Sequence, residues 1–363
     1  MSTTRPRLLI VIVNYNGFDL TRDCLESVAD QIHEVPGARV GLCDNGSRPG
    51  TPDAPGDAER LKQLILERGW QVWCELTVVD PNLGFTGGNN AVIEPYLASP
   101  DTTPTYTLLL NNDTLLREGS LRTLVGFMDD RPDVGLAGAR LEDPDGTPQV
   151  AAFHFNSPTR ELEAVATNGL VSRLLRSHQR IEPIPEQPTR VGWVAGASLI
   201  IRDTVLREVG PLDSEYYTYF DDIDYCQAAA AAGHETWYVP EARIVHLVGQ
   251  TTGVTEANSA TTTRPKRPKR RGAYWFEARR RYWLKHHGRF GAVRADLAQL
   301  AGVAVSRLWR PQIHPDRFWR DCWSQSVFRR GFKLPRVQNP ALAAGAANRP
   351  PHAEAVQRVL TVD

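Results

Sequence analysis

The first 140 residues alternate short apolar runs with amphipathic stretches, and this alternation constrains the fold more than any other feature. Leu8–Val13 is a continuous apolar run, which is typical of a strand covered on both faces. Three further β-rich runs follow it along the chain: Arg39–Cys43, Glu75–Val79 and Tyr106–Leu110. Strands that alternate with helices form βαβ units, so the pattern predicts an α/β fold with a mainly parallel sheet.

Helices are predicted between these strands, and the second half of the chain follows another pattern. The helices of the first half are expected around Leu20–Val28, over Asp57–Arg68 and over Glu118–Met128. Beyond a strand at Val134–Ala139 the alternation stops. The later elements expected are a turn at Asp145-Gly146, strands at Val194–Ile201, Thr236–Val239 and Ala242–Leu247, and a helix over Asp222–Ala232 that Gly233 ends. From Tyr274 onward the chain is predicted to be helical again.

Polar side chains follow several of the apolar runs closely. They are Asn14, Asp44, Asn82 and Asp113. Ligands of open α/β sheets bind outside the carboxyl ends of the strands. The sequence therefore predicts one ligand site at this edge.

Asn111-Asn112-Asp113 has two interpretations when taken alone. Asx clusters after strands are often turns that satisfy the backbone or cap a helix. Oxygen-bearing side chains in this position can also hold Mg²⁺ or Mn²⁺ together with diphosphate oxygens. The segment Asp44-Asn45-Gly46-Ser47 has the same ambiguity between a turn and a binding loop.

The glycine-rich segment Asn82–Asn90 suggests a close backbone approach to a ligand, because glycine has no side chain to obstruct it. It matches neither a Walker loop nor a Rossmann Gly-x-Gly-x-x-Gly, which argues against a P-loop kinase or a dehydrogenase. A nucleotidyltransferase should carry a glycine-rich N-terminal loop and a lysine, and Val13–Leu20 has neither.

Three further features also have structural alternatives. The acidic segment Phe220–Asp224 holds three carboxylates, which suit the first turn of a helix as well as a catalytic site. His246 lies between apolar residues, where a histidine is often part of the core. Trp193 opens an apolar strand, and a buried tryptophan is likewise common in cores.

Taken together, these segments resemble the family 2 glycosyltransferases, which have a GT-A fold, from roughly Arg7 to Thr252. The resemblance implies that Tyr15 and Asn16 border the nucleotide base and that Asp44 binds it. The remaining donor-side residues that it implies are Asn82, Gly84, Gly88, Asn89, Asn111 and Asn112.

The resemblance also implies the reacting groups. Asp113 and His246 would bind Mg²⁺ or Mn²⁺, and Asp222 would be the catalytic base. The acceptor side would comprise Trp193, Gly196, Asp221 and Asp224. A carboxylate can accept the proton of an acceptor hydroxyl, and neighbouring acids should raise the pKa of Asp222. The metal would neutralise the nucleoside diphosphate that leaves, so we expect one displacement with inversion.

The closest resemblance within the family is to bacterial rhamnosyltransferase-like members that build cell-wall or exported polysaccharide. dTDP-rhamnose is therefore the first donor expected, and UDP-N-acetylglucosamine, a UDP-hexose or UDP-galactofuranose is the alternative. The acceptor expected is a glycan or a polyprenyl-diphosphate-linked sugar. A non-catalytic carbohydrate-binding scaffold is also possible, but it should lack Asp113, Asp222 or His246, and all three are present.

A basic segment stands out from the balanced total of 42 basic and 42 acidic residues. Residues 264–289 hold eleven Lys or Arg against one acid, Glu277, and aromatic residues such as Trp275 and Trp283 are interleaved with them. Such a segment predicts peripheral contact with an anionic membrane, a clamp on the donor diphosphate or a merely solvated run. Nucleic-acid binding is not expected, because no recognition motif accompanies the patch.

The remaining expectations concern compartment and domain organisation. Five scattered cysteines suggest neither disulfides nor zinc, and no apolar run reaches the length of a membrane span. We therefore expect a cytoplasmic protein, peripheral at most on the inner face of the membrane. The expected parts are a catalytic domain over 1–255 with a nucleotide-sugar half (1–140) and an acceptor half (141–255), a basic mobile loop over 256–272, a helical extension over 273–333 and a loosely ordered tail over 334–363.

Overall fold

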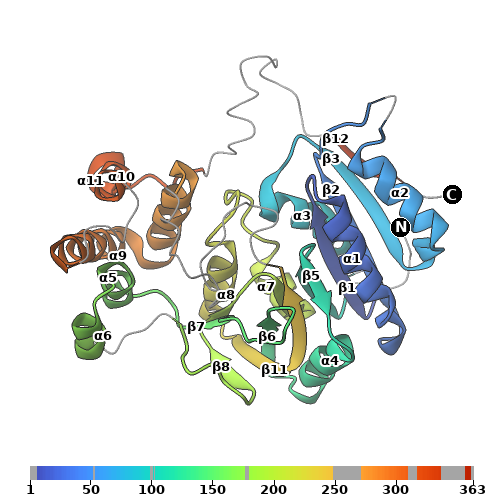
Figure 1. Ribbon diagram of the computed structural model, residues 1–363, viewed down its shortest axis with the longest axis horizontal. Coiled ribbons are helices and arrows are strands. Elements are labelled where there is room, and N and C mark those ends of the chain that lie inside the picture. Colours follow the sequence, from blue (N-terminus) through green and yellow to red (C-terminus); the bar gives the residue numbers. More distant parts are fainter. Residues whose placement is uncertain are drawn as a thin grey trace.

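A computed structural model of the chain describes residues 6–51, 54–98, 101, 103–175, 180–247, 271–309, 317–336 and 356–360. A central sheet is flanked by helices, and a separate group of helices lies beside it (Figure 1). The predicted mobile loop falls outside the described residues except at Arg271 and Gly272. Most of the predicted tail falls outside them too.

The sheet confirms the predicted α/β class. Its order is β12-β3-β2-β1-β4-β10-β6-β11-β5, and β8 pairs with β11. The four strands predicted first are parallel neighbours: β1 (Leu8–Asn14), β2 (Ala38–Asn45), β3 (Cys74–Asp80) and β4 (Tyr106–Asn111). Leu8 to Ile12 are fully buried, as expected for a strand covered on both faces.

The later strands continue the same sheet in mixed orientation. They are β5 (Thr114–Leu116), β6 (Val134–Glu142), β8 (Thr189–Val191), β10 (Ser198–Arg202) and β11 (Glu235–His246), and β7 (Ala152–Phe153) and β9 (Trp193–Val194) form a separate two-stranded sheet. β10 lies antiparallel between β4 and β6. β12 (Val356–Leu360), which the sequence did not predict, pairs with β3.

Two strand predictions need correction. Val194–Ile201 is not one strand, because β9 belongs to the two-stranded sheet and β10 to the large sheet. Between them the Ala195 amide donates to the Ala151 carbonyl. The two strands predicted at 236–239 and 242–247 are one strand, β11, with a register shift between Val239 and Arg243. Pro240 lies in that shift, and a proline cannot donate to the ladder.

The helices predicted in the first half are present, and several others are new. The helices of the described residues are α1 (Phe18–Ala29), α2 (Asp57–Glu67), α3 (Gly84–Leu97), α4 (Ser120–Asp130), α5 (Pro158–Ala166), α6 (Gly169–Leu175), α7 (Asp203–Val209), α8 (Asp221–Ala231), α9 (Ala273–Trp309), α10 (Phe318–Gln325) and α11 (Val327–Arg330). Short 3₁₀ turns occupy Ile32–Glu34 and Trp70–Val72. Gly233, with a φ of 92°, follows the end of α8 as predicted.

The helical extension packs as a lobe of α5, α6, α9, α10 and α11 (Figure 1). Glu161 of α5 accepts hydrogen bonds from Arg279 and from the indole of Trp283. Arg279 also pairs with Asp296 at 2.6 Å, and its guanidinium is almost fully buried. Gly288, with a φ of 64°, breaks α9 into two segments.

This packing contradicts the interfacial role predicted for the first part of α9. Phe276, Tyr282 and Trp283 are buried, so they cannot face a membrane. The arginines among them are engaged within the protein: besides Arg279, Arg280 donates to the Gln325 carbonyl and Arg281 pairs with Asp213. Arg279 and Arg280 hold the lobe together, whereas Arg281 links it to the segment before α8. The predicted diphosphate clamp is also wrong for Arg279 and Arg280, which are buried.

Candidate active site

The carboxyl ends of β1 and β2 are joined by a buried hydrogen-bond network around Asn14. Its side-chain amide donates to Asp44 at 2.7 Å and to Asp57 at 3.1 Å. Its carbonyl accepts from Thr21 at 2.7 Å, and the Asn112 amide donates to the Thr21 hydroxyl at 2.9 Å. The network therefore connects Asp44 with the Asn-Asn-Asp segment.

Asp44 is buried, and burial raises its pKa above the ordinary value, although hydrogen bonds from Ser47 and Asn14 oppose the shift. Ser47 also accepts from the Asn16 amide, and the Asn16 side chain accepts from the Arg48 amide. Asn16 is exposed and Tyr15 half-buried at this edge. These contacts bring Asn16 and Asp44, which were both predicted to lie at the nucleotide base, together around the short loop that follows β2.

Sequence reasoning left several members of this network out of the site. Asn14 was noted only as a polar strand end and Ser47 only as part of the segment Asp44-Asn45-Gly46-Ser47, whereas Thr21 and Asp57 were not singled out. Asp57 starts a helix far along the chain, so its contact with Asn14 has no local signal. The signal for Asn14 and Ser47 was their position beside Tyr15 and Asp44.

The glycine-rich segment forms the start of α3, and its glycines pack against the protein itself. A Cβ on Gly84 would lie 2.5 Å from the Tyr217 carbonyl oxygen. The Oδ1 of Asn82 accepts from the Gly84 N–H, and the Nδ2 of Asn89 donates to the Phe85 carbonyl. Asn89 is almost fully buried. Packing thus accounts for these residues without a ligand, although Asn82 and Gly84 lie at the strand-end edge.

Gly88→Ala is expected to lower the free energy of unfolding by about 1–3 kcal/mol, since overpacking strains a filled interior. The added Cβ would lie 2.8 Å from Val13 Cγ1 and 2.9 Å from Asn45 Nδ2. Gly126→Ala in α4 is the matched control, because nothing lies within 4 Å of its added Cβ. It should stabilise the protein by about 0.5–1 kcal/mol. Urea unfolding of both variants checks the pair, and equal effects would contradict the packing role.

Asp113 and His246 meet where β5 pairs with β11. His246 ends β11 opposite Thr114, the residue after Asp113. The His246 Nε2 lies 3.5 Å from the Asp113 Oδ1, and both side chains are slightly exposed. The nearby Asn111 has a buried side-chain oxygen with no hydrogen-bond partner among the described residues.

This donor set suits a divalent metal. A carboxylate and an imidazole are ligands that Mn²⁺ accepts, and Mg²⁺ commonly uses one or two carboxylates plus substrate phosphates. The described residues contain no group of three or more His, Cys, Asp or Glu that could hold a metal. A metal at this pair would thus depend on ligands from a phosphate or water.

Asp222 lies in the first turn of α8 with its carboxylate held by two backbone amides. Its Oδ1 accepts from Ile223 at 2.8 Å and its Oδ2 from Gly196 at 3.3 Å. Burial raises the pKa of Asp222 to about 6. Burial and the charge of Asp222 also raise the pKa of Asp221. A carboxylate with this pKa is ionised at neutral pH and can accept a proton.

The other residues predicted for the acceptor side differ in how directly they contact Asp222. Gly196 lies directly against Asp222, because a Cβ there would be 3.4 Å from the Asp222 Cβ. Trp193 stacks on Phe153, with ring centroids 4.1 Å apart. Asp224 is buried and accepts from Tyr216, Lys285 and His286, so it anchors α8 to α9.

The residues before α8 adopt a strained backbone. Tyr219 and Phe220 have φ values of 67° and 62°, a region that bulky residues seldom occupy. Aromatic contacts from α9 hold them: Tyr219 stacks on Tyr274, and Phe220 contacts Trp275. Such strain is often found at functional sites.

Backbone contacts bring the parts of the site together. The Asn111 amide donates to the Ala197 carbonyl at 3.1 Å. Ala197 follows Gly196, which contacts Asp222, and Asn111 lies two residues before Asp113. The Asp113–His246 pair, Asp222 and the Asp44 network therefore share the edge of the sheet that the sequence predicted.

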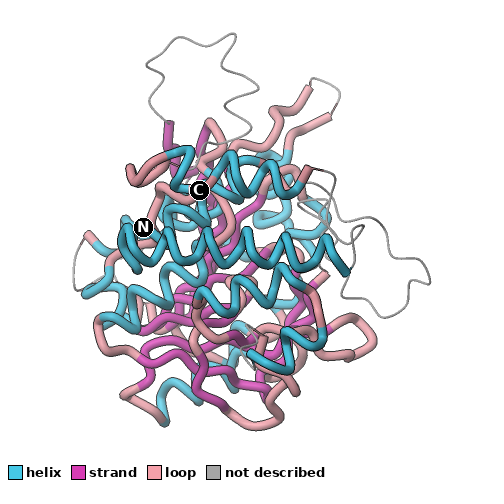
Figure 2. The backbone as a smooth tube through the Cα atoms, turned by 90° about the vertical axis from the view of Figure 1, so that its left-hand side faces the viewer, coloured by secondary structure: helices cyan, strands magenta, loops and turns pink. Residues whose placement is uncertain are grey.

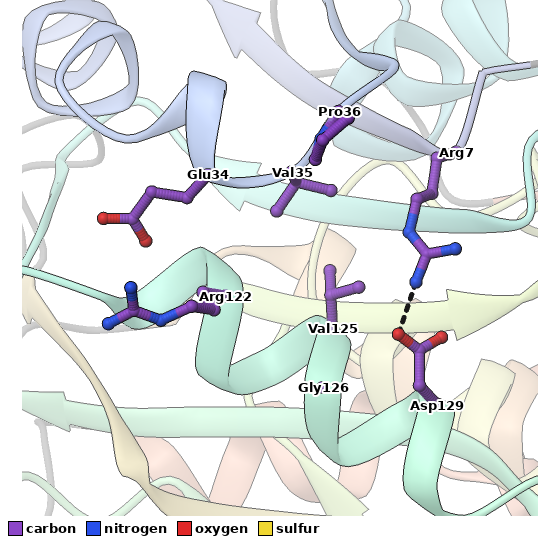
Figure 3. Close-up of a pocket in the computed structure, with 8 residues that line it drawn as sticks. All are labelled: Arg7, Glu34, Val35, Pro36, Arg122, Val125, Gly126 and Asp129. Carbon is purple, nitrogen blue, oxygen red and sulfur yellow. Dashed lines mark hydrogen bonds and ion pairs between the residues drawn. The ribbon is translucent and has the colours of Figure 1, made fainter.

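A hollow of 390 Å³ lies away from the candidate site (Figure 3). Its lining includes Arg7 before β1 and Pro36 before β2, which places it at the opposite edge of the sheet. Arg7 and Asp129 pair with each other across it. This hollow contains none of the predicted site residues.

The chain is similar to several known glycosyltransferases. The N-acetylglucosaminyl-diphospho-decaprenol L-rhamnosyltransferase of Mycobacterium tuberculosis is 27% identical over 59% of this chain and 68% of its own length. Rhamnosyltransferase WbbL of Escherichia coli K12 is 25% identical over 50% of this chain and 68% of its own. The structure of GalNAc-T7 with UDP, GalNAc and Mn²⁺ aligns with a TM-score of 0.51 at 13% identity, over 91% of this chain and 59% of that one, which supports a GT-A fold.

The family assignment rests on a match that covers most of the chain. The profile described as "Glycosyltransferase like family 2" matches residues 6–274, which include every residue of the candidate site. The match begins before β1 and extends into α9. The chain therefore belongs to glycosyltransferase family 2 and is an enzyme that transfers a sugar from a nucleotide-sugar donor.

Proposed function

We propose that this enzyme is an inverting, metal-dependent glycosyltransferase that moves rhamnose from dTDP-rhamnose to a hydroxyl of a glycan or lipid-linked acceptor. The observation that carries the proposal is the position of two reacting groups at one edge of the sheet. The Asp113–His246 pair and the Asp222 carboxylate are connected through Asn111, Ala197 and Gly196.

Asp222 is the base of the proposed reaction. Its carboxylate accepts the proton of the acceptor hydroxyl while that oxygen bonds to the anomeric carbon of the sugar. The bond from that carbon to the diphosphate breaks in the same step, and the nucleoside diphosphate leaves. One displacement of this kind inverts the anomeric centre.

Asp113 and His246 are the proposed ligands of Mn²⁺ or Mg²⁺, and a bound metal would offset the negative charge of the diphosphate. The distance of 3.5 Å between Oδ1 and Nε2 supports this role, because one ion can contact both atoms. The buried Asn111 side-chain oxygen, which has no hydrogen-bond partner among the described residues, belongs to the residue two positions before Asp113.

The Asp44 network forms the proposed nucleotide end of the site. Asn14, buried between Asp44 and Thr21, fixes the orientation of the Asp44 carboxylate. Tyr15 and Asn16 lie at the edge of this network, where a base could stack and hydrogen-bond. We assign Asn111 and Asn112 to the segment between the nucleotide end and the metal pair.

Two relatives support the choice of sugar and acceptor. Both carry rhamnosyltransferase names, and one name includes a diphospho-decaprenol acceptor. A lipid-linked acceptor would place the reaction at the inner face of the membrane. None of the helices in the described residues combines the length and the apolarity of a membrane span.

A panel of nucleotide sugars tests the proposed donor. dTDP-rhamnose with Mn²⁺ is expected to raise the melting temperature and to be hydrolysed slowly, whereas EDTA should abolish both responses. The increase follows from preferential binding to the folded state. A response to one UDP-sugar alone would overturn the rhamnosyl assignment. A protein that responds to no donor would contradict the enzymatic proposal itself.

A further inference from the structure

The second segment of α9 exposes a face that is largely apolar. It consists of residues that recur every three or four positions, which we call the exposed helix face: Phe290, Arg294, Leu297, Ala301, Ala304 and Leu308. Phe290 is 74% exposed and Leu308 83% exposed. Residues at this spacing lie along one side of a helix.

The opposite side of the same helix is buried and partly polar. It includes Asp296, Gln299 and Ser306, each nearly inaccessible to solvent. Asp296 is satisfied by Arg279 and by the Val327 amide. Apolar residues such as Ala295 and Val303 are buried on the same side, so the helix is apolar both toward the protein and toward water.

Aromatic residues of the neighbouring elements extend this surface. Trp319 and Trp323 of α10, Phe328 of α11 and Phe332 are all exposed. Thirteen large hydrophobic residues are exposed in the described part of the chain, and eleven of them lie either in α6 or beyond Arg289. The lobe forms one side of the molecule, which faces the viewer in Figure 2. Apolar exposure concentrated in this way marks an interaction surface.

Arginines accompany the aromatic rings. The guanidinium of Arg294 lies 5.6 Å from the Phe290 centroid, and that of Arg289 lies 5.7 Å from the Phe332 centroid. Trp319 is contacted by Arg307 and by Arg320. Tryptophan and arginine side by side are typical of the zone between lipid headgroups and acyl chains.

The charge of this surface is strongly positive. The described residues in 289–309 and 317–336 include nine Lys or Arg, all exposed, and two acids, Asp296 and Asp321, both buried. A second copy of the chain would bring like charges together, which opposes self-association. An anionic membrane complements both the charge and the apolar side chains.

We propose that the exposed helix face and the aromatic residues around it bind the surface of an anionic lipid bilayer. The predicted membrane contact thus moves from the buried aromatics of the first α9 segment to the exposed ones of the second. The inference deepens the proposed function and rests on it for the lipid-linked acceptor. α9 also contacts α8 through Lys285 and Asp224, so binding would hold the acceptor side of the site near the lipid.

Vesicle flotation with the full chain tests this inference. The wild-type protein is expected to float with vesicles of phosphatidylglycerol and phosphatidylcholine, and weakly or not at all with phosphatidylcholine alone. Phe290→Asp combined with Leu308→Asp should weaken binding about tenfold or more, because two charges replace inserted apolar groups. Leu66→Asp combined with Val72→Asp is the matched control, since both residues are exposed on the nucleotide-binding half. This control should bind like the wild type.

Donor response separates failure of this inference from failure of the proposed function. Both double variants should keep the wild-type melting temperature and the wild-type response to dTDP-rhamnose with Mn²⁺. The proposed lipid-binding surface would be overturned if the wild type did not bind the vesicles. It would also be overturned if the Phe290→Asp/Leu308→Asp variant bound them as well as the wild type. A third outcome is a wild-type protein that does not bind vesicles but sediments as a dimer, with the dimer lost only in the Phe290→Asp/Leu308→Asp variant. This outcome would overturn the lipid surface and identify the face as a contact between copies of the chain.

Discussion

Asp222→Asn is expected to lower kcat by about 100-fold to 10,000-fold, the range that positioned general bases contribute. An asparagine keeps the size of the side chain and can still accept from the Ile223 amide, but it cannot take up the acceptor proton. Donor affinity should therefore stay unchanged in calorimetry. Asp30→Asn, at the exposed end of α1, is the matched control and should leave kcat unchanged.

The pH profile adds a signature of this base. Burial raises the pKa of Asp222 to about 6, so the active carboxylate form is present above this pH and is lost as the pH falls through it. For the wild type, kcat/KM should fall about tenfold per pH unit on the acid side. Asp222→Asn should remove this limb. Near-normal turnover of Asp222→Asn would contradict the assignment.

The second large effect is expected from the proposed metal pair. Asp113→Asn and His246→Ala should each lower Mn²⁺-dependent activity by about 100-fold or more, because electrostatic stabilisation of a leaving diphosphate is a large term. The activity of the double variant should be only slightly below that of the less active single variant, since the effects of substituting two residues that act on one ion are not additive. Steady-state rates across a Mn²⁺ titration measure both effects.

His234→Ala is the matched control for this pair. His234 precedes β11, whereas His246 ends it, and His234 contacts Glu208 on the surface instead of the site. Its removal should leave the Mn²⁺ dependence unchanged. Undiminished Mn²⁺-dependent donor binding in both Asp113→Asn and His246→Ala would contradict the proposed metal ligands.

The strands of the first 140 residues could be predicted from local sequence, because most of their residues are buried. A short continuous apolar run such as Leu8–Val13 is typical of a buried strand, and polar residues directly after such a strand lie at the sheet edge. The same logic brought Asp44, Asp113 and Asn14 to one edge. The split at Ala195 could not be predicted, since it depends on a hydrogen bond to a distant carbonyl.

The lobe could not be predicted, because its stability depends on pairs far apart in sequence. Arg279 and Glu161 are separated by 118 residues, and only their contact reveals that this part of α9 is buried. Arginines between aromatic residues have the same composition in a buried ion-pair network and on a membrane-facing helix. The helical spacing of Phe290, Leu297 and Leu308 is visible in the sequence. Whether that side of α9 is buried or exposed depends on which side the rest of the protein covers.

The glycines of α3 show a related limit. A sequence reveals that a side chain is absent at Gly88, but not whether a ligand or the protein fills the space. In the fold, Val13 and Asn45 fill it.

The stereochemistry of the first product tests the central claim most directly. With the donor that responds in the panel and a hydroxyl acceptor, NMR should show an anomeric configuration opposite to that of the donor. This result follows from a single displacement in which Asp222 deprotonates the acceptor. A product that retains the donor configuration would contradict both the mechanism and the role of Asp222.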